Sequence, residues 1–318
     1  MMRKTTPLEA FFLVGPTAVG KTDVAHLLAE RMGCRILSVD SMQVYTGMDI
    51  GTAKPSIEER KRFNYGGIDL STPEKSFSVW DYREAAMAFL RKSDVLGCPV
   101  IAVGGSGLYV KSLTDGLQAV APADERIRRH WQEMLKAADG LALLQQEAMK
   151  KDPAAYQTLP DRQNPRRLIR LIEKAGFEQG GGGSPGRPER QERAPLVGIS
   201  MPAMDLSQRI EKRAGEMLAC GLLEEAHALE ERYGKLSPTA GQAIGYAEAF
   251  DVIAGKMTIS SAVAEIARRT RQLAKRQMTW FRHQAEVKWL PAGNGVSAGQ
   301  LADAVAAEWE RYGPTAIE

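Results

Sequence analysis

Short apolar runs alternate with longer amphipathic stretches along much of the chain. The apolar runs are rich in Val, Ile, Leu and Phe, which is typical of buried strands in a parallel sheet. Strands are expected over residues 10–14, 35–39, 99–103, 196–200 and 287–290. Their alternation with helical segments predicts an α/β fold in which a parallel sheet is flanked by helices.

The strand pattern stops between about residues 122 and 194, and helical periodicity replaces it. We therefore predict an α/β core at 1–120 and 196–318, interrupted by an all-helical insertion at 121–195. Further helices are expected over 205–228 and 260–283. The glycine-rich run 180–188 is too poor in apolar side chains to join a core, so it predicts a flexible loop.

Composition narrows the class of protein. The 318 residues are 44% hydrophobic and 25% charged, which is ordinary for a soluble globular protein. No apolar run approaches the ~20 residues that span a membrane, so we expect no membrane partner. Three cysteines without a C-x-x-C pair argue against a zinc site or a disulfide framework. Together these features predict a cytoplasmic protein.

The first expected strand leads into a loop that reads Gly-Pro-Thr-Ala-Val-Gly-Lys-Thr, here called the 15–22 loop. It matches G-x-x-x-x-G-K-[ST] and precedes a helix-like segment, the context in which this motif cradles phosphate. Backbone N–H groups would form an anion nest, Lys21 would reach the phosphate oxygens, and Thr22 would bind Mg²⁺. The residues predicted to bind a phosphorylated ligand are Gly15, Pro16, Thr17, Ala18, Val19, Gly20, Lys21 and Thr22. The core is therefore expected to be a P-loop-type parallel sheet.

Asp40 directly follows the second expected strand, and the glycine cluster 104–107 follows the third. Ligands bind at this carboxyl edge in open parallel sheets. The Asp40 carboxylate suits three roles: helix N-cap, partner of Mg²⁺, or catalytic base. Spacing alone leaves these alternatives open.

Two groups of basic residues suggest anionic partners. Arg209 and Arg213 lie four apart, on one face of an expected helix. Between residues 268 and 288 there are seven basic residues and one acid. On the helix expected around this segment, the apolar stripe predicted to be buried is Ile259, Val263, Ile266, Leu273 and Trp280. Another face of the same helix is basic and consists of Arg268, Arg271, Lys275 and Arg282. Solvated faces normally mix signs, so a one-signed face favours an RNA backbone.

Longer segments, 38–55 above all, resemble the bacterial type of the tRNA dimethylallyltransferase (tRNA isopentenyltransferase) family. Together with the 15–22 loop, the matching segments are 103–109, 165–170, 242–246 and 270–277. The resemblance implies transfer of a dimethylallyl group from dimethylallyl diphosphate to N6 of adenine 37, beside the anticodon of tRNA. It implies that Asp40 is the general base, that Thr17 and Lys21 also belong to the catalytic site, and that Arg209 and Arg213 clamp the diphosphate.

The resemblance also implies a tRNA-binding surface, in which the helical insertion grips the anticodon stem-loop. The implied contacts are Asp40, Ser41, Met42, Gln43, Ser106, Arg128, Asn164, Pro165, Arg166, Arg167, Leu168, Gln242, Gly245, Tyr246, Arg271, Gln272, Lys275 and Arg276. Mg²⁺ is the expected cofactor, and the protein is expected to be a monomer.

Three other functions are compatible with parts of the pattern. The 15–22 loop alone does not distinguish prenyl from phosphoryl transfer, so one alternative is a kinase for a small molecule or nucleotide. Another is an isopentenyltransferase acting on free AMP or ADP, and a third is an RNA-binding protein with an inactive loop. The helical insertion and the 271–277 segment favour tRNA as substrate, and intact Lys21, Thr22 and Asp40 favour an active enzyme.

Overall fold

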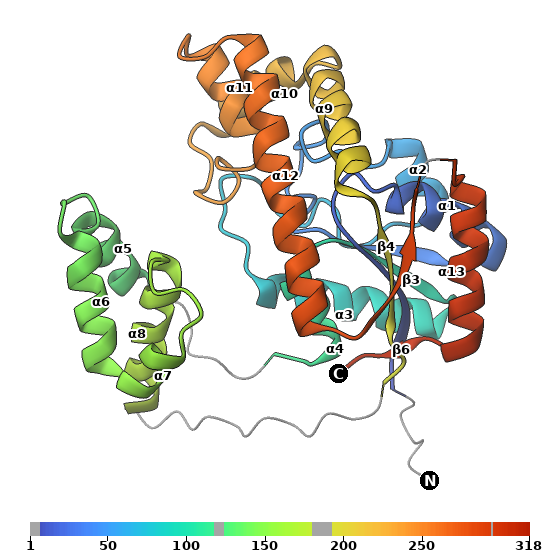
Figure 1. Ribbon diagram of the computed structural model, residues 1–318, viewed down its shortest axis with the longest axis horizontal. Coiled ribbons are helices and arrows are strands. Elements are labelled where there is room, and N and C mark those ends of the chain that lie inside the picture. The colour runs from blue at the N-terminus through green and yellow to red at the C-terminus, as the bar shows by residue number, and fades with distance from the viewer. Residues whose placement is uncertain (1–6, 118–123, 180–192, 294) are drawn as a thin grey trace. The chain divides into compact units, whose positions relative to one another are not determined.

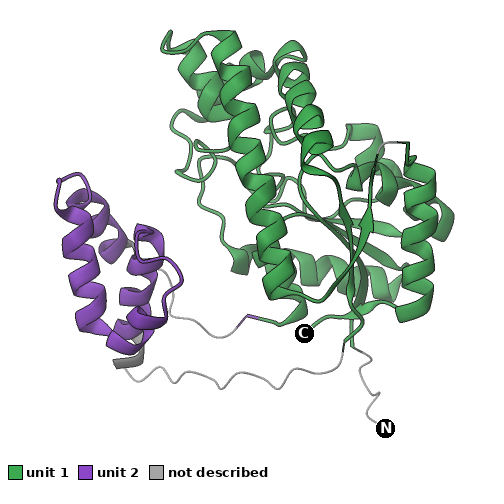
Figure 2. Cartoon of the chain, in the orientation of Figure 1, with its two compact units in different colours: residues 1–116, 192–318 green, residues 117–191 purple. Residues whose placement is uncertain are grey.

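The structure is a computed structural model that describes residues 7–117, 124–179, 193–293 and 295–318. The chain divides into two compact units, residues 1–116 with 192–318 and residues 117–191 (Figure 2). The larger unit contains the sheet, and the smaller unit contains helices. The glycine-rich run predicted to be a flexible loop lies outside the described residues.

The sheet of the larger unit has the strand order β2-β3-β1-β4-β5. Its strands are β1 (Glu9–Val14), β2 (Arg35–Val39), β3 (Val100–Gly104), β4 (Leu196–Ser200) and β5 (Val287–Pro291). These five pair in parallel, and β6 (Thr315–Ala316) pairs with β1 in the antiparallel sense. The register aligns Val14 with Gly104 and Val39 with Gly104. The loops that leave β1, β2 and β3 therefore meet at one edge of the sheet.

Helices cover both faces of this sheet (Figure 1). On one face, α1 (Lys21–Met32) packs against α13 (Ala298–Tyr312). On the other, α3 (Val79–Val95) packs against α4 (Gly107–Thr114), and α4 contacts α12 (Ile259–Gln284). The remaining helices of this unit are α2 (Ile57–Arg62), α9 (Ala203–Ala219), α10 (Leu222–Tyr233) and α11 (Tyr246–Ile253). Helix α12 runs beside α9 and extends from α11 to α4, so it passes along the sheet (Figure 1).

The smaller unit has its own apolar core, formed around Trp131, Leu144, Leu168 and Ile172. Its helices are α5 (Glu125–Met134), α6 (Gly140–Lys151), α7 (Pro153–Thr158) and α8 (Pro165–Gln179). One charged side chain, Glu173, is also buried there, and its carboxylate pairs with the guanidinium groups of Arg128 and Arg170 at 2.7 Å each.

The fold agrees with the predicted class, one expected helix was wrong, one expected stripe was right only in part, and one short strand was not predicted. The helix expected over 205–228 is two helices, because the chain turns at Gly221, where φ is 100°. Strand β6 was not anticipated, since a pair of residues carries no period. Of the stripe predicted for α12, Ile266 is buried and Val263 and Trp280 pack partly buried against the core, but Ile259 is 56% exposed. The other buried residues of this helix are Ala262, Ala267, Ala274 and Phe281. Small alanines line the stripe because α12 packs closely against its neighbours. Within the described ranges, no helix is long and apolar enough to cross a membrane.

Candidate active site

The 15–22 loop joins β1 to α1 and has an unusual backbone conformation. Gly15, Ala18 and Gly20 have φ values of 145°, 64° and 95°. Gly15 has no alternative, because a Cβ there would lie 2.4 Å from the carbonyl oxygen of Ile199. Ala18 holds a left-handed conformation that costs free energy for a residue with a side chain, so its surroundings must maintain it. The loop thus curls tightly at the start of α1, where helix amides favour anions.

Lys21 lies inside this loop, and its Nζ donates a hydrogen bond of 2.6 Å to the Pro16 carbonyl oxygen. Burial lowers the pKa of Lys21 to about 7; Asp40 opposes this change, and Arg213 adds to it. The Asp40 carboxylate and the Arg213 guanidinium therefore lie close enough to Lys21 to change its pKa. A buried lysine whose pKa is near neutrality is typical of a functional site.

Asp40 is held at the end of β2 by local hydrogen bonds. One carboxylate oxygen accepts a bond of 2.8 Å from the Met42 amide. The amide of Ser41, the residue between Asp40 and Met42, donates a hydrogen bond of 3.0 Å to the Ser106 hydroxyl. This bond connects the turn after β2 to the turn after β3. The Met42 amide thus orients the Asp40 carboxylate.

A cavity of about 390 Å³ unites these groups. The 15–22 loop lines one side and Asp40 another, and Arg209 and Arg213 reach into it from α9. Arg209 passes close to Gly20, where a Cβ would lie 3.4 Å from Nη1. Burial lowers the pKa of Arg213, while Asp40, Glu216 and Asp23 raise it. The structure therefore brings together the predicted phosphate loop, the predicted base and both predicted clamp arginines.

Oxygen donors for a magnesium ion are present in the same cavity. Thr22, Asp23 and Asp40 line it. Among the described residues, no group of three or more His, Cys, Asp and Glu side chains could hold a metal ion. Mg²⁺ commonly uses one or two protein oxygens and takes its other ligands from phosphate and water. The residues present fit that arrangement.

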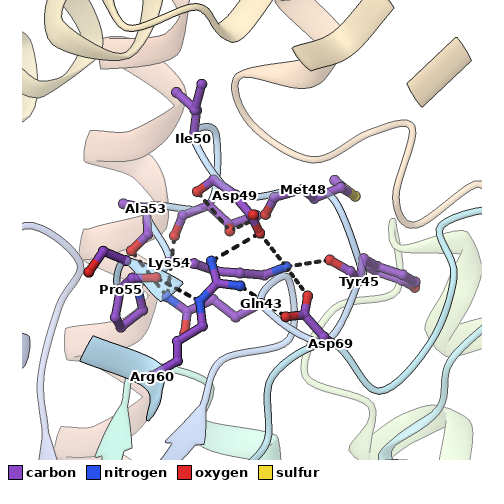
Figure 3. A network of polar contacts seen from close by, with 12 residues as sticks. Gln43, Tyr45, Met48, Asp49, Ile50, Ala53, Lys54, Pro55, Arg60 and Asp69 are labelled. Carbon is purple, nitrogen blue, oxygen red and sulfur yellow. Dashed lines mark hydrogen bonds and ion pairs between the residues drawn. The ribbon is translucent and has the colours of Figure 1, made fainter. Parts of the chain in front are cut away.

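The loop after β2 also forms a wall of the cavity, and ion pairs hold this loop in place (Figure 3). The ammonium group of Lys54 lies 2.9 Å from Asp49 and 2.6 Å from Asp69, and it donates to the Tyr45 carbonyl oxygen at 2.5 Å. Arg60 pairs with the same two carboxylates. Burial alone would raise the pKa of Asp49, but Lys54 and Arg60 lower it on balance. Two cations, Lys54 and Arg60, and two carboxylates, Asp49 and Asp69, therefore stabilise this loop by pairing with one another.

Glu225 of α10 holds this loop from the opposite side. Its carboxylate accepts hydrogen bonds from the Ile50 amide at 2.9 Å, from the Asp49 amide at 3.2 Å and from the Tyr246 hydroxyl at 2.5 Å. No sequence pattern indicated Glu225. Lys54 belongs to a segment that resembles the family, but a role for its side chain was not predicted. Glu225 thus positions the cavity wall from a distant part of the chain, and Lys54 does so from within the loop itself.

Several predicted tRNA contacts have their side chains engaged inside the protein. Tyr246 and Leu168 are each 0% exposed. Gln43 accepts from the Ser38 hydroxyl at 2.7 Å, and Arg128 pairs with Glu173. Asn164 caps α8 by accepting from the Arg166 amide at 3.1 Å. For these positions, contact with tRNA stays a prediction.

Other predicted contacts are exposed. In the smaller unit, Arg166 and Arg167 are exposed on α8 and line a hollow of about 630 Å³ together with Arg170 and Lys174. On α12 the exposed predicted contacts include Lys275 and Arg276. Arg166, Arg167, Lys275 and Arg276 are thus solvent-exposed, and their contact with tRNA stays a prediction.

The expectation of a one-signed basic face on α12 was wrong. Arg268 pairs with Glu265 at 2.6 Å, and Arg271 pairs with Glu211 of α9 at 2.8 Å. Arg269 pairs with the buried Glu248. The acids come from the preceding turn and from other helices, so the sign count over 268–288 missed them.

Known proteins share this sequence and fold. A sequence model of the family described as IPP transferase matches residues 43–284, and one described as isopentenyl transferase matches residues 8–65. The tRNA dimethylallyltransferase of Pelotomaculum thermopropionicum is 36% identical over 302 residues, which cover 92% of this chain and 94% of that protein. A tRNA dimethylallyltransferase 2 of Geotalea daltonii is 38% identical and covers 91% of this chain and 89% of its own.

Solved structures agree with the sequence relatives. The crystal structure of the tRNA isopentenylpyrophosphate transferase of Bacillus halodurans superposes with a TM-score of 0.68 at 34% identity and covers 96% of this chain and 98% of its own. A eukaryotic dimethylallyltransferase acting on tRNA shares the fold with a TM-score of 0.73 at 22% identity, over 95% of this chain and 79% of its own. The fold and the sequence define a prenyl-transferring class of enzyme. The chain belongs to the tRNA dimethylallyltransferase family.

Proposed function

We propose that this protein transfers the dimethylallyl group of dimethylallyl diphosphate to N6 of adenine 37 in tRNA, which releases diphosphate. One observation carries the proposal: residues of the 15–22 loop, two arginines and the Asp40 carboxylate all line a single cavity. The loop and the arginines would stabilise the negative charge of a departing diphosphate. The carboxylate would accept a proton from the nucleophile. The names and structures of the relatives support tRNA as the substrate.

The exocyclic amine of adenine is a weak nucleophile, because its lone pair is delocalised into the ring. In the proposed reaction N6 forms a bond to the allylic carbon while that carbon loses its bond to the diphosphate oxygen. Asp40 accepts the proton that N6 releases. Its carboxylate is already oriented by the Met42 amide, so little reorganisation is needed.

Negative charge grows on the diphosphate as the C–O bond breaks. The loop amides, Lys21, Arg209 and Arg213 line the cavity where this charge would develop. A preorganised set of donors stabilises such charge more strongly than water does. Mg²⁺ held by Thr22, with Asp40 or Asp23 nearby, would neutralise further charge on the leaving group.

The target base must leave its stack to reach a cavity of this size. A second tRNA-binding surface would help, because binding energy gained away from the reacting base can offset the free energy needed to unstack it. The exposed arginines of α8 fit that purpose. An isopentenyltransferase for free AMP, or a kinase for a small molecule or nucleotide, would not need them.

The test is incubation with dimethylallyl diphosphate, Mg²⁺ and unmodified tRNA, followed by mass analysis of the nucleosides. We expect one dimethylallyl group on adenosine 37. The matched controls are the same tRNA carrying guanosine at position 37, which should gain nothing, and AMP, which should react very poorly. Failure to modify adenosine would refute the proposal, and equal kcat/KM for AMP and for an anticodon stem-loop would refute tRNA as the substrate.

A further inference from the structure

One peptide group of the 15–22 loop, that between Pro16 and Thr17, is held at both ends by side chains. Its carbonyl oxygen accepts a hydrogen bond from Lys21 Nζ at 2.6 Å. Its N–H donates to Gln277 Oε1 at 2.8 Å. Because a peptide group is planar, two bonds on opposite sides fix its rotation. The next residue is Ala18, whose left-handed conformation requires such support.

Gln277 comes from α12, 260 positions further along the chain than Thr17. It reaches the loop because Gly105 has no side chain: a Cβ there would lie 2.3 Å from Gln277 Nε2. One turn along α12, Trp280 packs on Gly107 in the same way, since a Cβ there would lie 2.2 Å from its ring. Two glycines after β3 therefore let α12 approach closely enough for Gln277 to line the cavity.

Diphosphate binding would disturb this arrangement on one side only. Lys21 is the cation expected to turn toward the phosphate oxygens, and it would then release the Pro16 carbonyl oxygen. Of the two bonds that fix the Pro16–Thr17 peptide, the one from Gln277 would remain. A neutral amide also suits the position, because a carboxylate there would repel the diphosphate.

We propose that Gln277 is a positioning residue that keeps the 15–22 loop in its anion-binding conformation when Lys21 engages the diphosphate. This inference rests on the proposed function and adds a residue of α12 to the diphosphate site. It makes the helix that carries the exposed Lys275 and Arg276 part of the support of that site.

The test uses Gln277→Met, which keeps the length of the side chain and removes the acceptor. Titration calorimetry with inorganic diphosphate and saturating Mg²⁺ should show about tenfold weaker binding, the loss expected when a buried amide goes unpaired. The KM for dimethylallyl diphosphate should rise by a similar factor, while the KM for tRNA stays within about threefold. Gln284→Met is the matched control, since Gln284 is an exposed glutamine of the same helix, and it should leave all three values unchanged.

A second variant approaches the same bond from the other side. Gly105→Ala should displace the Gln277 amide, and its Cβ would also lie 3.0 Å from the Gly15 carbonyl oxygen, so it should weaken diphosphate binding at least as much. Adding Gln277→Met to Gly105→Ala should then weaken binding little further. Equal diphosphate affinity in Gln277→Met and wild type, while wild type transfers the prenyl group to tRNA, would overturn this inference and leave the proposed function standing. A rise confined to the KM for tRNA would overturn it too, because Gln277 would then serve the tRNA site. Failure of the wild type to transfer the group would be a failure of the proposed function.

Discussion

The charge of Lys21 should make diphosphate binding depend on pH in a particular direction. The pKa of Lys21 is about 7 in the free protein, because burial outweighs the help of Asp40. A bound diphosphate favours the charged amine and should return the pKa toward its ordinary value of about 10.4. Below pH 7 Lys21 is already charged, so its protonation does not alter affinity. Above pH 7 each binding event must take up a proton, and affinity should fall.

The size of the effect follows from the charged fraction. About a quarter of the lysine is charged at pH 7.5 and about 1% at pH 9, so the apparent Kd should rise about twentyfold over this range. The phosphate groups are fully ionised throughout, since their last pKa is near 6. The ligand's own titration therefore does not mask the change.

Titration calorimetry with dimethylallyl diphosphate and saturating Mg²⁺, without tRNA, measures both quantities. In buffers of different ionisation enthalpy, binding at pH 7.5 should take up roughly three-quarters of a proton. Lys21→Arg is the matched control, because arginine stays charged and its Kd should not change with pH. A wild-type Kd that is constant from pH 7.5 to 9, with no proton uptake, would refute the assignment of Lys21 to the diphosphate site.

Three further outcomes are expected. Asp40→Asn keeps the shape of the base but loses its proton affinity, so kcat should fall by about 10²–10⁴-fold with both KM values nearly unchanged; recovery of the initial rate at high Mg²⁺ would show a metal ligand instead. Reversing Lys275 and Arg276 to Glu should lower the slope of log Kd against log salt for tRNA by about two units in filter-binding titrations, and an unchanged slope would remove them from the interface. Glu173→Ala removes the buried partner of two arginines and should destabilise the smaller unit by about 3 kcal/mol in urea unfolding; a loss below about 1 kcal/mol would contradict a structural role for this carboxylate.

Local patterns determined much of the larger unit. The strands predicted at 35–39 and 196–200 have the observed bounds, and the other three differ by one residue at one or both ends. Val, Ile and Leu in short runs suffice for this because a strand buried on both faces needs apolar side chains at nearly every position. The 15–22 loop and Asp40 could also be identified from the sequence, since each directly follows a predicted strand and is recognised from a few neighbouring residues.

Tertiary structure decided which charges are free and which hold the protein together. From the sequence, Arg271 and Arg128 were expected to contact RNA. In the structure Arg271 pairs with Glu211 of α9, and Arg128 pairs with Glu173 of α8. No sequence pattern indicated Glu225, and Gln277 belongs to a segment that resembles the family, although a role for its side chain was not predicted. Each bonds to backbone amides more than 150 positions away, at Ile50 and Thr17.

The division has a physical reason. Strand burial and a glycine-rich turn depend on neighbours in sequence, so periodicity and residue type along the chain by themselves determined the α/β sheet, the 15–22 loop and the position of Asp40. The partner of a buried charge or amide depends on which helices the sheet brings together. Only the folded chain decided that Glu225 of α10 bonds to the loop after β2 and that Gln277 of α12 bonds to the 15–22 loop.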